Sequence, residues 1–443
     1  MRTNQQGGGA PSMGALGLLA VAVLATALIA AFAYAVVGLP PLIGIDDAAI
    51  TRNYAENIAN GHGFVYYPGG ERVEGATSFL WTVALAGVYL IDQTPEALIV
   101  AICGALAALG VFSTLSLTTL AARRIGISER AALVAALVGL AASPGYFYWT
   151  VFTMMEVALW SATILFLVWR LARMVEIDEG WDVGVIVAAS LLPLIRPEGA
   201  AAALGLLALT ALLLGRASRG LVVAGGATLA AAAAIVGFRL AYFGYPVPNT
   251  FYAKVSSDRA QDLVDGSKYV FSFVTGAPFA EILIALLAMA AIWAVGRRFS
   301  RREGGAAAIL IAAAAVAGIF AVYAALGGDH FAYWRFLMPV APLLVLAPAL
   351  AAAALVPALR AAAPPAVGLS ALAAGAAIWV GVAAGDLRQA RFDVVKEITL
   401  VEKGVAFGEL LNEFEPRPVL GTGPAGGVSL GYDGVILDLL GLN

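Results

Sequence analysis

The sequence contains few residues that serve as surface charges, thiol ligands or titratable imidazoles. Only 12% of its 443 residues are charged, one is cysteine and two are histidine. A soluble domain carries about a quarter charged residues, so this composition excludes an ordinary soluble protein. The single cysteine, Cys103, excludes an intrachain disulfide and a thiolate metal site. The formal net charge of −3 predicts no nucleic-acid partner.

Motifs of nucleotide- or metal-dependent catalysis are also missing. The chain has no Gly-rich nucleotide loop, no HExxH motif and no nucleophile elbow. These absences disfavour a nucleotide-driven enzyme or a metalloprotease. We expect no cofactor and assign no metal ligands; a divalent metal stays open, but no motif indicates one.

Long apolar segments dominate what the sequence does contain. Hydrophobic residues make up 61% of the chain, and the mean hydropathy is +0.89. A run of about 20 apolar residues crosses a bilayer as a helix. We therefore predict an all-α polytopic membrane protein with about eleven transmembrane helices, at residues 14–38, 97–121, 131–149, 157–173, 183–195, 200–215, 220–242, 279–296, 306–326, 336–358 and 366–385.

The segment 77–91 is apolar but short, so we interpret it as an interfacial or re-entrant helix inside an external loop at 39–96. With that choice the arginine clusters share one side of the membrane, which the positive-inside rule makes cytoplasmic. We predict a multi-pass protein of the bacterial inner membrane, with a cytoplasmic N-terminus and an extracytoplasmic active site and C-terminus. The clusters are Arg123/Arg124/Arg130, Arg170/Arg173, Arg216/Arg219, Arg297/Arg298/Arg301/Arg302 and Arg360.

The first external loop holds the densest group of polar residues and begins with Asp46 and Asp47. Mutual repulsion and partial desolvation prepare one carboxylate of such a pair as a general base for a hydroxyl. The same residues also suit the start of a helix, and the sequence leaves both roles open. His62 and Glu74 are candidate substrate ligands, with solvated turn residues as the alternative interpretation.

Later external loops add further candidates. Glu156, Arg196 and Glu198 lie at the outer ends of predicted spans, where charged residues either serve a site or snorkel to the interface. Basic residues in two aromatic-rich loops either bind a phosphate or anchor the protein at the interface. The candidates in these loops are Asn249, Tyr252 and Lys254 in one, and Asp329, His330 and Arg335 in the other.

Two regions outside the spans have a predicted local structure. Residues 47–60 are expected to form an interfacial helix with an ion pair between Arg52 and Glu56. After residue 385 the composition becomes mixed, and an amphipathic helix is predicted at 386–414. Two short strands are then expected, at residues 417–423 and 435–440.

These pieces resemble a known family. The stretch DDAAITRNYAENIANGHGFVYYPGGERVEGATSFLW is similar to the first external loop of GT-C type membrane glycosyltransferases. The resemblance is to the branch with the mycobacterial arabinofuranosyltransferase AftB and the flagellar-motor control protein ZomB. It extends, in the same order, to YWTVFTMMEVAL, LIRPEGAA, YFGYPVPNTFYAKV, GGDHFAYWRFLMPV and ILDLLGLN. It implies a GT-C-like catalytic domain at 1–385 and a short extracytoplasmic segment at 386–443.

Such enzymes transfer a sugar from a polyprenyl-phosphate donor to a hydroxyl acceptor on the outer face of the membrane. The resemblance implies a pentofuranose such as arabinofuranose, or a hexose, and a glycan, lipid or protein acceptor. It maps the catalytic base onto the pair Asp46 and Asp47. We expect Asp46 to take the acceptor proton and Asp47 to orient the acceptor or share the proton. Membrane lipids are further expected partners. The donor phosphate is expected to bind Lys254, Arg335 and Arg196.

A lipid-linked sugar flippase or transporter is the rival class, and a non-catalytic envelope assembly protein is a third. Transporters place ionisable groups and broken helices near the middle of the bilayer. In this sequence the unusual charges lie at the ends of the spans. This distribution favours the enzyme.

Overall fold

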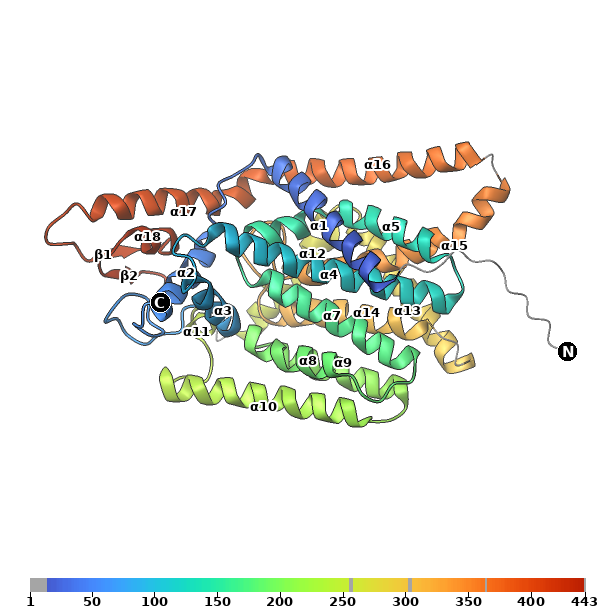
Figure 1. Ribbon diagram of the computed structural model, residues 1–443, viewed down its shortest axis with the longest axis horizontal. Helices are drawn as coiled ribbons and strands as arrows, with labels where there is room; N and C mark the ends of the chain where they lie inside the picture. The colour runs from blue at the N-terminus through green and yellow to red at the C-terminus, as the bar shows by residue number, and fades with distance from the viewer. Residues whose placement is uncertain (1–13, 255–257, 302–304, 363–364, 442–443) are drawn as a thin grey trace.

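The computed structural model describes residues 14–254, 258–301, 305–362 and 365–441. Most of the long helices run broadly along the longest dimension of the molecule (Figure 1). The elements of the first half are α1 (Ala15–Val37), α2 (Asp46–Ala59), α3 (Phe79–Tyr89), α4 (Glu96–Ile125), α5 (Glu129–Ala141), α6 (Pro144–Phe147), the π-helix η1 (Tyr148–Phe152), α7 (Val157–Glu176), α8 (Val183–Ile195) and α9 (Gly199–Leu214). The second half contains α10 (Arg219–Tyr242), α11 (Asn249–Lys254), α12 (Arg259–Gly276), α13 (Ala280–Arg301), α14 (Ala306–Ala325), the 3-10 helix η2 (Met338–Val345), α15 (Leu346–Ala362), α16 (Pro365–Gln389), α17 (Arg391–Leu411), β1 (Leu420–Thr422), α18 (Gly426–Gly431) and β2 (Ile436–Asp438).

The helices confirm the polytopic architecture but not the number of crossings. Within the described residues, seven helices are long and apolar enough to span a membrane, and a bent pair formed by 129–141 and 144–152 makes up to eight. Each predicted span coincides with a helix. However, α8 and α9 have only 13 and 16 residues. The count of about eleven therefore stays a prediction.

Helix α1 shows how small residues build these spans. Its buried residues recur every three or four positions and include Ala22, Ala30 and Ala33, and the helix packs on α4. Alanine lets two backbones approach closely. Other positions expose Leu16 and Leu24, which are 84% and 60% accessible. One side of α1 thus packs on protein, and the rest presents the apolar surface that lipid requires.

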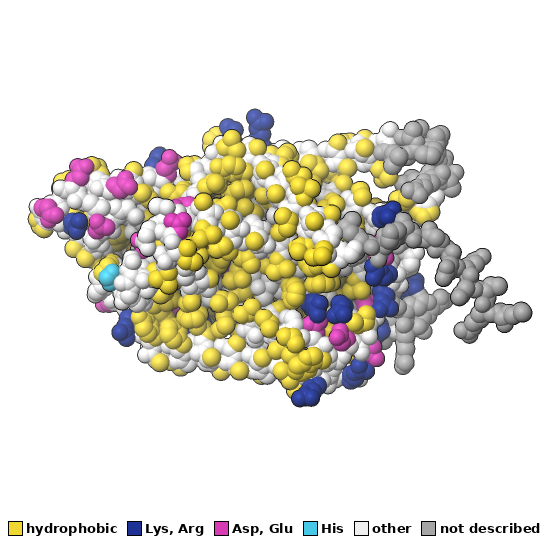
Figure 2. Space-filling model, in the orientation of Figure 1, with side chains coloured by type: hydrophobic (Ala, Val, Ile, Leu, Met, Phe, Trp, Pro, Cys, Tyr) yellow, Lys and Arg dark blue, Asp and Glu magenta, His cyan; other side chains and the backbone are white. Residues whose placement is uncertain are grey.

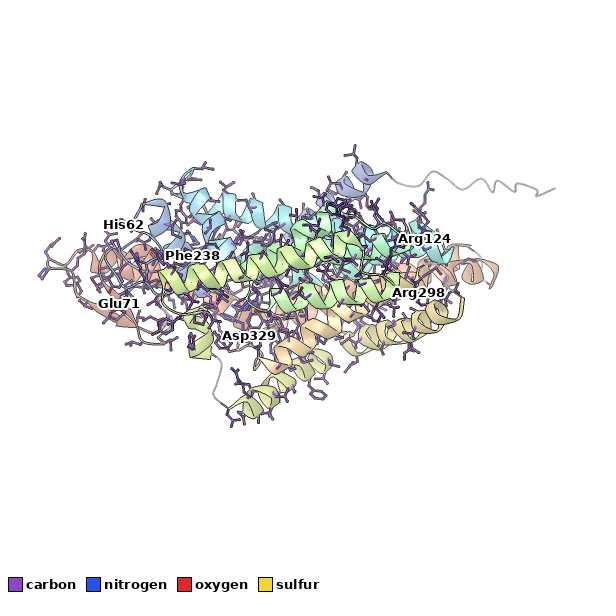
Figure 3. The ribbon with its side chains drawn as sticks, turned by 90° about the horizontal axis from the view of Figure 1, so that it is seen from below. His62, Glu71, Arg124, Phe238, Arg298 and Asp329 are labelled. Atoms are coloured by element: carbon purple, nitrogen blue, oxygen red, sulfur yellow. The ribbon has the colours of Figure 1, made fainter. Side chains whose placement is uncertain are left out.

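The two ends of the molecule differ from the surface between them. Hydrophobic side chains form a broad belt on the face in Figure 2, and charged side chains gather toward both ends. Seen from below, His62 and Glu71 lie at one end, and Arg124 and Arg298 at the other (Figure 3). A belt between two polar ends is what a multi-pass membrane protein requires. Which end faces the cytoplasm stays a prediction.

The segment 39–96, predicted to be the first external loop, folds into two helices, α2 and α3, that pack on each other. Helix α3 has 11 residues, too few for a helix to cross the hydrocarbon core. Its length agrees with the interpretation of 77–91 as a segment that does not span the membrane. Helix α2 is largely buried in the protein, so its side chains have fixed neighbours.

Arg52 on α2 corrects one prediction. Its guanidinium forms an ion pair with Glu96 and donates to the Tyr89 hydroxyl at 3.2 Å and the Ile43 carbonyl at 3.0 Å. Within the described residues, the expected ion pair with Glu56 does not form. Arg52 is only 3% exposed, and a buried guanidinium needs several acceptors. Three surrounding groups supply them, whereas one glutamate on the same helix does not.

The C-terminal segment adds the small α/β unit that the sequence predicts. Strands β1 and β2 pair in parallel, with Leu420 opposite Ile436 and Thr422 opposite Asp438. Both strands lie inside the predicted ranges. The single helix predicted at 386–414 is instead the end of α16 followed by α17, with a break at residue 390. Figure 1 shows α17, α18 and both strands beside α2 at one end of the molecule.

This segment and the first external loop share a hydrophobic core. The Tyr66 hydroxyl also donates to the Ala425 carbonyl at 2.8 Å. A stretch of about sixty residues is marginal as an independent domain, and the shared core supplies the apolar surface that it needs. The domain boundary at residue 385 stays a prediction. The core consists of Ile50, Tyr54, Phe64, Tyr66, Ala76, Ala425, Val428, Tyr432 and Ile436.

Candidate active site

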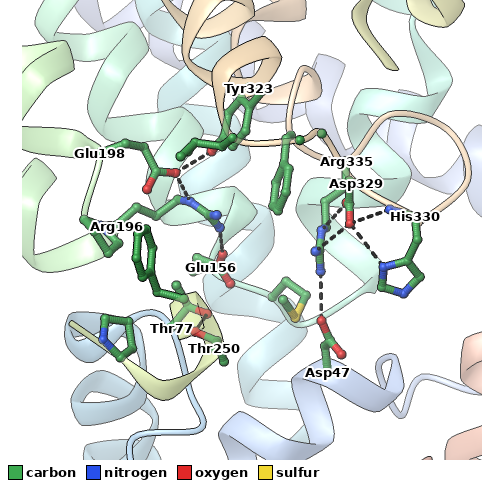
Figure 4. Close-up of a pocket in the computed structure, with 18 of the residues that line it drawn as sticks. Asp47, Thr77, Glu156, Arg196, Glu198, Thr250, Tyr323, Asp329, His330 and Arg335 are labelled. Carbon is green, nitrogen blue, oxygen red and sulfur yellow. Dashed lines mark hydrogen bonds and ion pairs between the residues drawn. The ribbon is translucent and has the colours of Figure 1, made fainter. Parts of the chain in front are cut away.

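A cavity of about 630 Å³ lies at the end of the molecule that carries the first external loop. It lies between α2, the start of α7, the junction of α8 and α9, α11, α12 and the loop after α14 (Figure 4). Segments that are far apart in the sequence therefore contribute to one space. Its ionisable lining residues are Asp47, Glu156, Arg196, Glu198, Asp262, Asp265, Tyr323, Asp329, His330 and Arg335.

The two adjacent aspartates begin α2 but point to different partners. Successive side chains on an α-helix are about 100° apart, so only one of the pair faces the cavity. Asp47 lines it, and its Oδ2 lies 3.1 Å from Nη1 of Arg335. Asp46 is directed to the C-terminal segment and is not part of the lining.

Asp46 connects α2 to α18. Its Oδ1 accepts a hydrogen bond from the Gly427 amide at 2.8 Å, and its Oδ2 accepts one from the Gly426 amide at 3.2 Å. Burial raises the pKa of Asp46 above its ordinary value, and the two amide bonds offset part of this rise. The geometry gives this carboxylate a role in holding two segments together.

Arg335 is the buried cation of the cavity, with only 2% of its surface exposed. Asp329 binds it through two hydrogen bonds, at 2.8 Å from Nε and 3.1 Å from Nη2. Asp47 accepts a third from Nη1 at 3.1 Å. Bidentate pairing with Asp329 fixes the plane of the guanidinium, so Nη1 is aimed at Asp47.

The loop that carries Arg335 depends on glycine. Gly328 has φ of +77°, a region that residues with a Cβ rarely adopt. A Cβ added to Gly328 would lie 2.5 Å from the Cβ of Tyr269. The close approach of this loop to α12 therefore requires glycine, and it brings Asp329 and Arg335 to the cavity.

Arg196 reaches the cavity because α8 ends before a proline. The residue before proline favours an extended backbone, and Arg196 has φ −146° and ψ 144°. Its guanidinium forms an ion pair with Glu156, at the start of α7, and a second with Glu198 at 2.6 Å from Nε. The Tyr323 hydroxyl also donates to Glu198, at 2.6 Å.

Glu198 is ionised by this arrangement in spite of its burial. Burial alone raises the pKa of a carboxyl group, but the Arg196 charge and the hydrogen bonds from Tyr323 and Arg196 outweigh it. The pKa of Glu198 is therefore held below its ordinary value of 4.5. Arg196 and Glu198 thus form a charged pair in a poorly hydrated place.

An aromatic ring links the two arginines. The centre of the Phe336 ring lies 4.6 Å from the guanidinium carbon of Arg196 and 4.5 Å from that of Arg335. Tyr323 stacks on the same ring, with centroids 4.5 Å apart. Cation–π contacts strengthen when they are removed from water, so Phe336 helps to hold both cations at one wall.

The structure brings together about half of the residues predicted for the site. Asp47, Glu156, Arg196, Glu198, Asp329, His330 and Arg335 line the cavity. Asp46, His62, Glu74, Asn249 and Tyr252 do not. The side chain of Lys254 lies outside the described part of the structure.

The residues away from the cavity have other surroundings. Glu74 is buried in a bidentate ion pair with Arg239, at 2.7 and 3.0 Å. Asn249 donates to the Gly441 carbonyl at 2.7 Å. Tyr252 is half-exposed beside other aromatic rings, and His62 lies in an exposed turn. Glu74 thus holds its loop to α10, and Asn249 holds the start of α11 to the C-terminal segment.

Sequence reasoning missed several lining residues, chiefly those of α12. Asp262 and Asp265 come from this helix. Thr77, in the loop before α3, and Thr250, on α11, also line the cavity, and their hydroxyls are 3.0 Å apart. The signal for α12 was present: its buried residues Asp262, Gly266, Tyr269 and Phe273 recur with helical spacing. Charged residues between these positions lower the hydrophobicity of the segment, so it was not recognised as a helix.

The arrangement combines proton acceptors with fixed positive charge. A carboxylate can accept a proton from a hydroxyl, and a guanidinium can bind the oxygens of a phosphate. Within the described residues, no group of three or more His, Cys, Asp or Glu side chains has the geometry of a metal site. The carboxylates and guanidinium groups that line the cavity can pair a base with an anion-binding wall.

Comparison with known proteins shows the fold. No protein-family model matches the chain, and no curated protein matches its sequence. The structure of ArnT from Cupriavidus metallidurans bound to undecaprenyl phosphate is similar, with 14% identity and a TM-score of 0.59, covering 94% of this chain and 86% of ArnT.

The oligosaccharyltransferase of Archaeoglobus fulgidus is also similar, with a TM-score of 0.52 both in complex with zinc and sulfate and in the apo form. The two structures are 15% and 14% identical to this chain and match 95% of it. The chain spans less than two thirds of that enzyme, namely 62% and 64% of the two structures. The protein thus has the fold of GT-C type membrane glycosyltransferases. The branch that contains AftB and ZomB is not confirmed.

Proposed function

We propose that the protein is an inverting glycosyltransferase that takes a sugar from a polyprenyl-phosphate donor. The observation that carries this proposal is the contact between Asp47 and the buried Arg335, 3.1 Å apart in a cavity that Arg196 also lines. This contact unites a base for a hydroxyl with a cation for a phosphate. The fold supports it, because one protein of that fold was solved with undecaprenyl phosphate bound.

Asp47 is the base in this mechanism, in place of Asp46. The acceptor oxygen attacks the anomeric carbon while its proton passes to the Asp47 carboxylate. The new carbon–oxygen bond forms as the bond from the anomeric carbon to the phosphate oxygen breaks, and the polyprenyl phosphate leaves with that electron pair. A single displacement of this kind inverts the anomeric centre. Asp46 acts indirectly, by holding the start of α2 against α18.

Arg335 stabilises the leaving phosphate. Its two hydrogen bonds to Asp329 and its one to Asp47 use three of the five N–H donors of a guanidinium. A donor phosphate competes with Asp47 for Nη1, while Asp329 keeps the guanidinium in place. Binding of the donor therefore releases the Asp47 carboxylate toward the acceptor hydroxyl. Such fixed charges are the most effective where water is excluded.

Arg196 is the second phosphate ligand, and Lys254 is proposed as a third. Glu156 and Glu198 position Arg196, and Glu198, Asp329 and His330 line the space available to the sugar and acceptor. We propose a pentofuranose such as arabinofuranose, or a hexose, as the sugar, and a glycan, lipid or protein as acceptor. We place the reaction on the outer face of a bacterial plasma membrane.

Transfer by the purified protein tests this proposal. Labelled polyprenyl-phosphate arabinofuranose or hexose is offered with an acceptor extract, and the product is separated from the donor. Asp47→Asn is expected to lower the transfer rate by about 10² to 10⁴, the usual contribution of a general base. Arg335 keeps its bidentate bonds to Asp329 in this variant, so the melting temperature should change little.

Asp265→Asn is the matched control. This carboxylate also lines the cavity but is bound to Lys268 and Gln261, so transfer should be nearly unchanged. Equal transfer by the Asp47→Asn variant and the wild type would refute the assignment of the base. Movement of the sugar lipid across liposomes without transfer would instead favour the flippase.

A further inference from the structure

A second cavity, of about 550 Å³, lies between α1, α4 and α7. It is at the other end of the molecule, where Figure 3 shows Arg124 far from Asp329. Its lining combines three arginines and two hydroxyl groups with apolar side chains, and within the described residues it includes no carboxylate. The residues are Ala15, Leu18, Phe112, Ser116, Thr119, Leu120, Arg123, Arg124, Trp169, Arg173 and Ile177.

Arg124 is the arginine of this cavity with the weakest protein partner. In the described part of the chain, its ion pair with Glu176 is 3.9 Å long, beyond hydrogen-bond distance. The Glu176 carboxylate accepts instead from the Gly305 and Ala307 amides, at 2.8 and 3.2 Å. The guanidinium of Arg124 therefore has donors to offer a ligand.

The other two arginines form pairs that an anion can join. Arg123 binds both carboxylate oxygens of Glu129 at 2.9 Å, and Arg173 binds Glu179 at 3.1 Å and lies 3.8 Å from Asp182. The side chain of Arg123 is 57% exposed and that of Arg173 is 36% exposed, and ion pairs that water reaches contribute little. Each guanidinium retains N–H donors beyond those pairs. Three guanidinium groups with N–H donors left for a ligand thus line the cavity.

The apolar part of the lining distinguishes a lipid from a small anion. Leu18, Phe112 and Leu120 form part of the wall, and α1 exposes other leucines, including Leu16 and Leu24, at its surface. A hydrophobic surface next to cations accommodates a molecule with both a phosphate and acyl chains. The positive-inside rule explains why arginines lie at this end, but it does not explain a cavity lined by them.

We propose that this cavity binds the headgroup of an anionic glycerophospholipid. Arg124 and Arg173 contact the phosphodiester, Ser116 and Thr119 lie within the headgroup space, and the acyl chains follow the exposed side of α1. Basic pockets between transmembrane helices are known to hold anionic headgroups. The site is separate from the cavity of Asp47 and does not depend on the function proposed for it.

Native mass spectrometry of the delipidated full chain tests the site. Phosphatidylglycerol is expected to bind the wild type more tightly than phosphatidylcholine with the same acyl chains. The double variant Arg124→Gln/Arg173→Gln should bind phosphatidylglycerol about thirtyfold more weakly, the combined contribution of two arginines near a membrane surface. Thr119→Phe, which keeps all charges and fills the cavity, should also weaken phosphatidylglycerol binding.

Arg216→Gln/Arg219→Gln is the matched control, because it removes the same charge at the same end from residues outside the lining. It should bind phosphatidylglycerol like the wild type. Equal affinity for the two lipids, or an equal loss in the control, would overturn the proposal. Displacement of phosphatidylglycerol by an equal concentration of inorganic phosphate would also overturn it, since the site would then hold only a small anion.

Discussion

At the scale of single residues, two neighbours with the same chemistry have different surroundings. Asp46 accepts hydrogen bonds from two backbone amides, whereas Asp47 contacts a buried guanidinium in a cavity. The sequence predicted that this pair matters but not which member faces the cavity. That choice depends on α18, about 380 residues further along the chain, and no local pattern reports so distant a contact.

The prediction of Arg335 and Arg196 was more specific. Both were expected at the outer ends of apolar segments, and both line the cavity. Their partners Asp329 and Glu198 are close to them in sequence, so short-range reasoning could find these pairs. Glu74 shows the limit of such reasoning. Its partner is Arg239, on α10, and the sequence did not connect the two.

The Glu198 carboxylate predicts how stability depends on pH. Because its pKa is lower in the folded protein than its ordinary 4.5, it stabilises the fold above that value, and this contribution is lost as the pH falls below it. Glu198→Gln removes the titration. The melting temperature of the wild type should therefore fall further between pH 6 and pH 3.5 than that of this variant. Melting curves in detergent, with the exposed Glu71→Gln as control, measure this difference.

Identical losses in the wild type and both variants would contradict the role of Glu198. In that case other carboxylates would dominate the acid sensitivity. Arg196 keeps its ion pair with Glu156 in the Glu198→Gln protein, so the variant is expected to fold.

At the scale of elements, apolar length predicted most of the architecture. A helix is present at each predicted span, and α3 is as short as expected. The interruptions were not predicted, because they depend on packing. They include the π-helix Tyr148–Phe152 and the 3-10 helix Met338–Val345. The first precedes the segment that brings Glu156 to the cavity, and the second follows the loop of Arg335.

The contact between α18 and α2 predicts a strong effect of one methyl group. A Cβ at Gly426 would lie 2.0 Å from the Asp46 carbonyl oxygen, so Gly426→Ala must push the C-terminal segment away from α2. Overpacking of this kind costs roughly 1–3 kcal/mol. Hydrogen exchange should therefore become faster in α2 and α18 than in the wild type.

Gly423→Ala is the control for this experiment. A Cβ at Gly423 meets no atom within 4 Å, so exchange in α2 and α18 should stay as in the wild type. If Gly426→Ala left exchange unchanged in both helices, the C-terminal segment would not hold α2.

Across the whole molecule, the two cavities lie at opposite charged ends. The carboxylate-rich cavity and the C-terminal segment lie at one end, and the arginine-lined cavity at the other. This separation agrees with the sorting of loops by charge in the sequence. The positive-inside rule predicts that the arginine end is cytoplasmic, and the Asp47 cavity would then face the opposite side of the membrane.

Thiol labelling of intact cells tests that orientation. The native Cys103 is buried, so it should give little background. Cysteine at His62 or Glu71 should react with a membrane-impermeant maleimide in intact spheroplasts, whereas cysteine at Arg216 should react only after permeabilisation. The reverse pattern would place the Asp47 cavity on the cytoplasmic side and contradict the proposed outer-face reaction.

The proposed reaction requires a sugar-linked polyprenyl phosphate to bind beside Asp47. A structure of the Asp47→Asn protein with such a donor tests it most directly, because the variant should bind the donor without consuming it. We predict the phosphate within hydrogen-bond distance of Arg335, the anomeric carbon facing residue 47, and Asp329 still paired with Arg335. A donor phosphate bound outside this cavity, with Arg335 making no contact to it, would contradict the account.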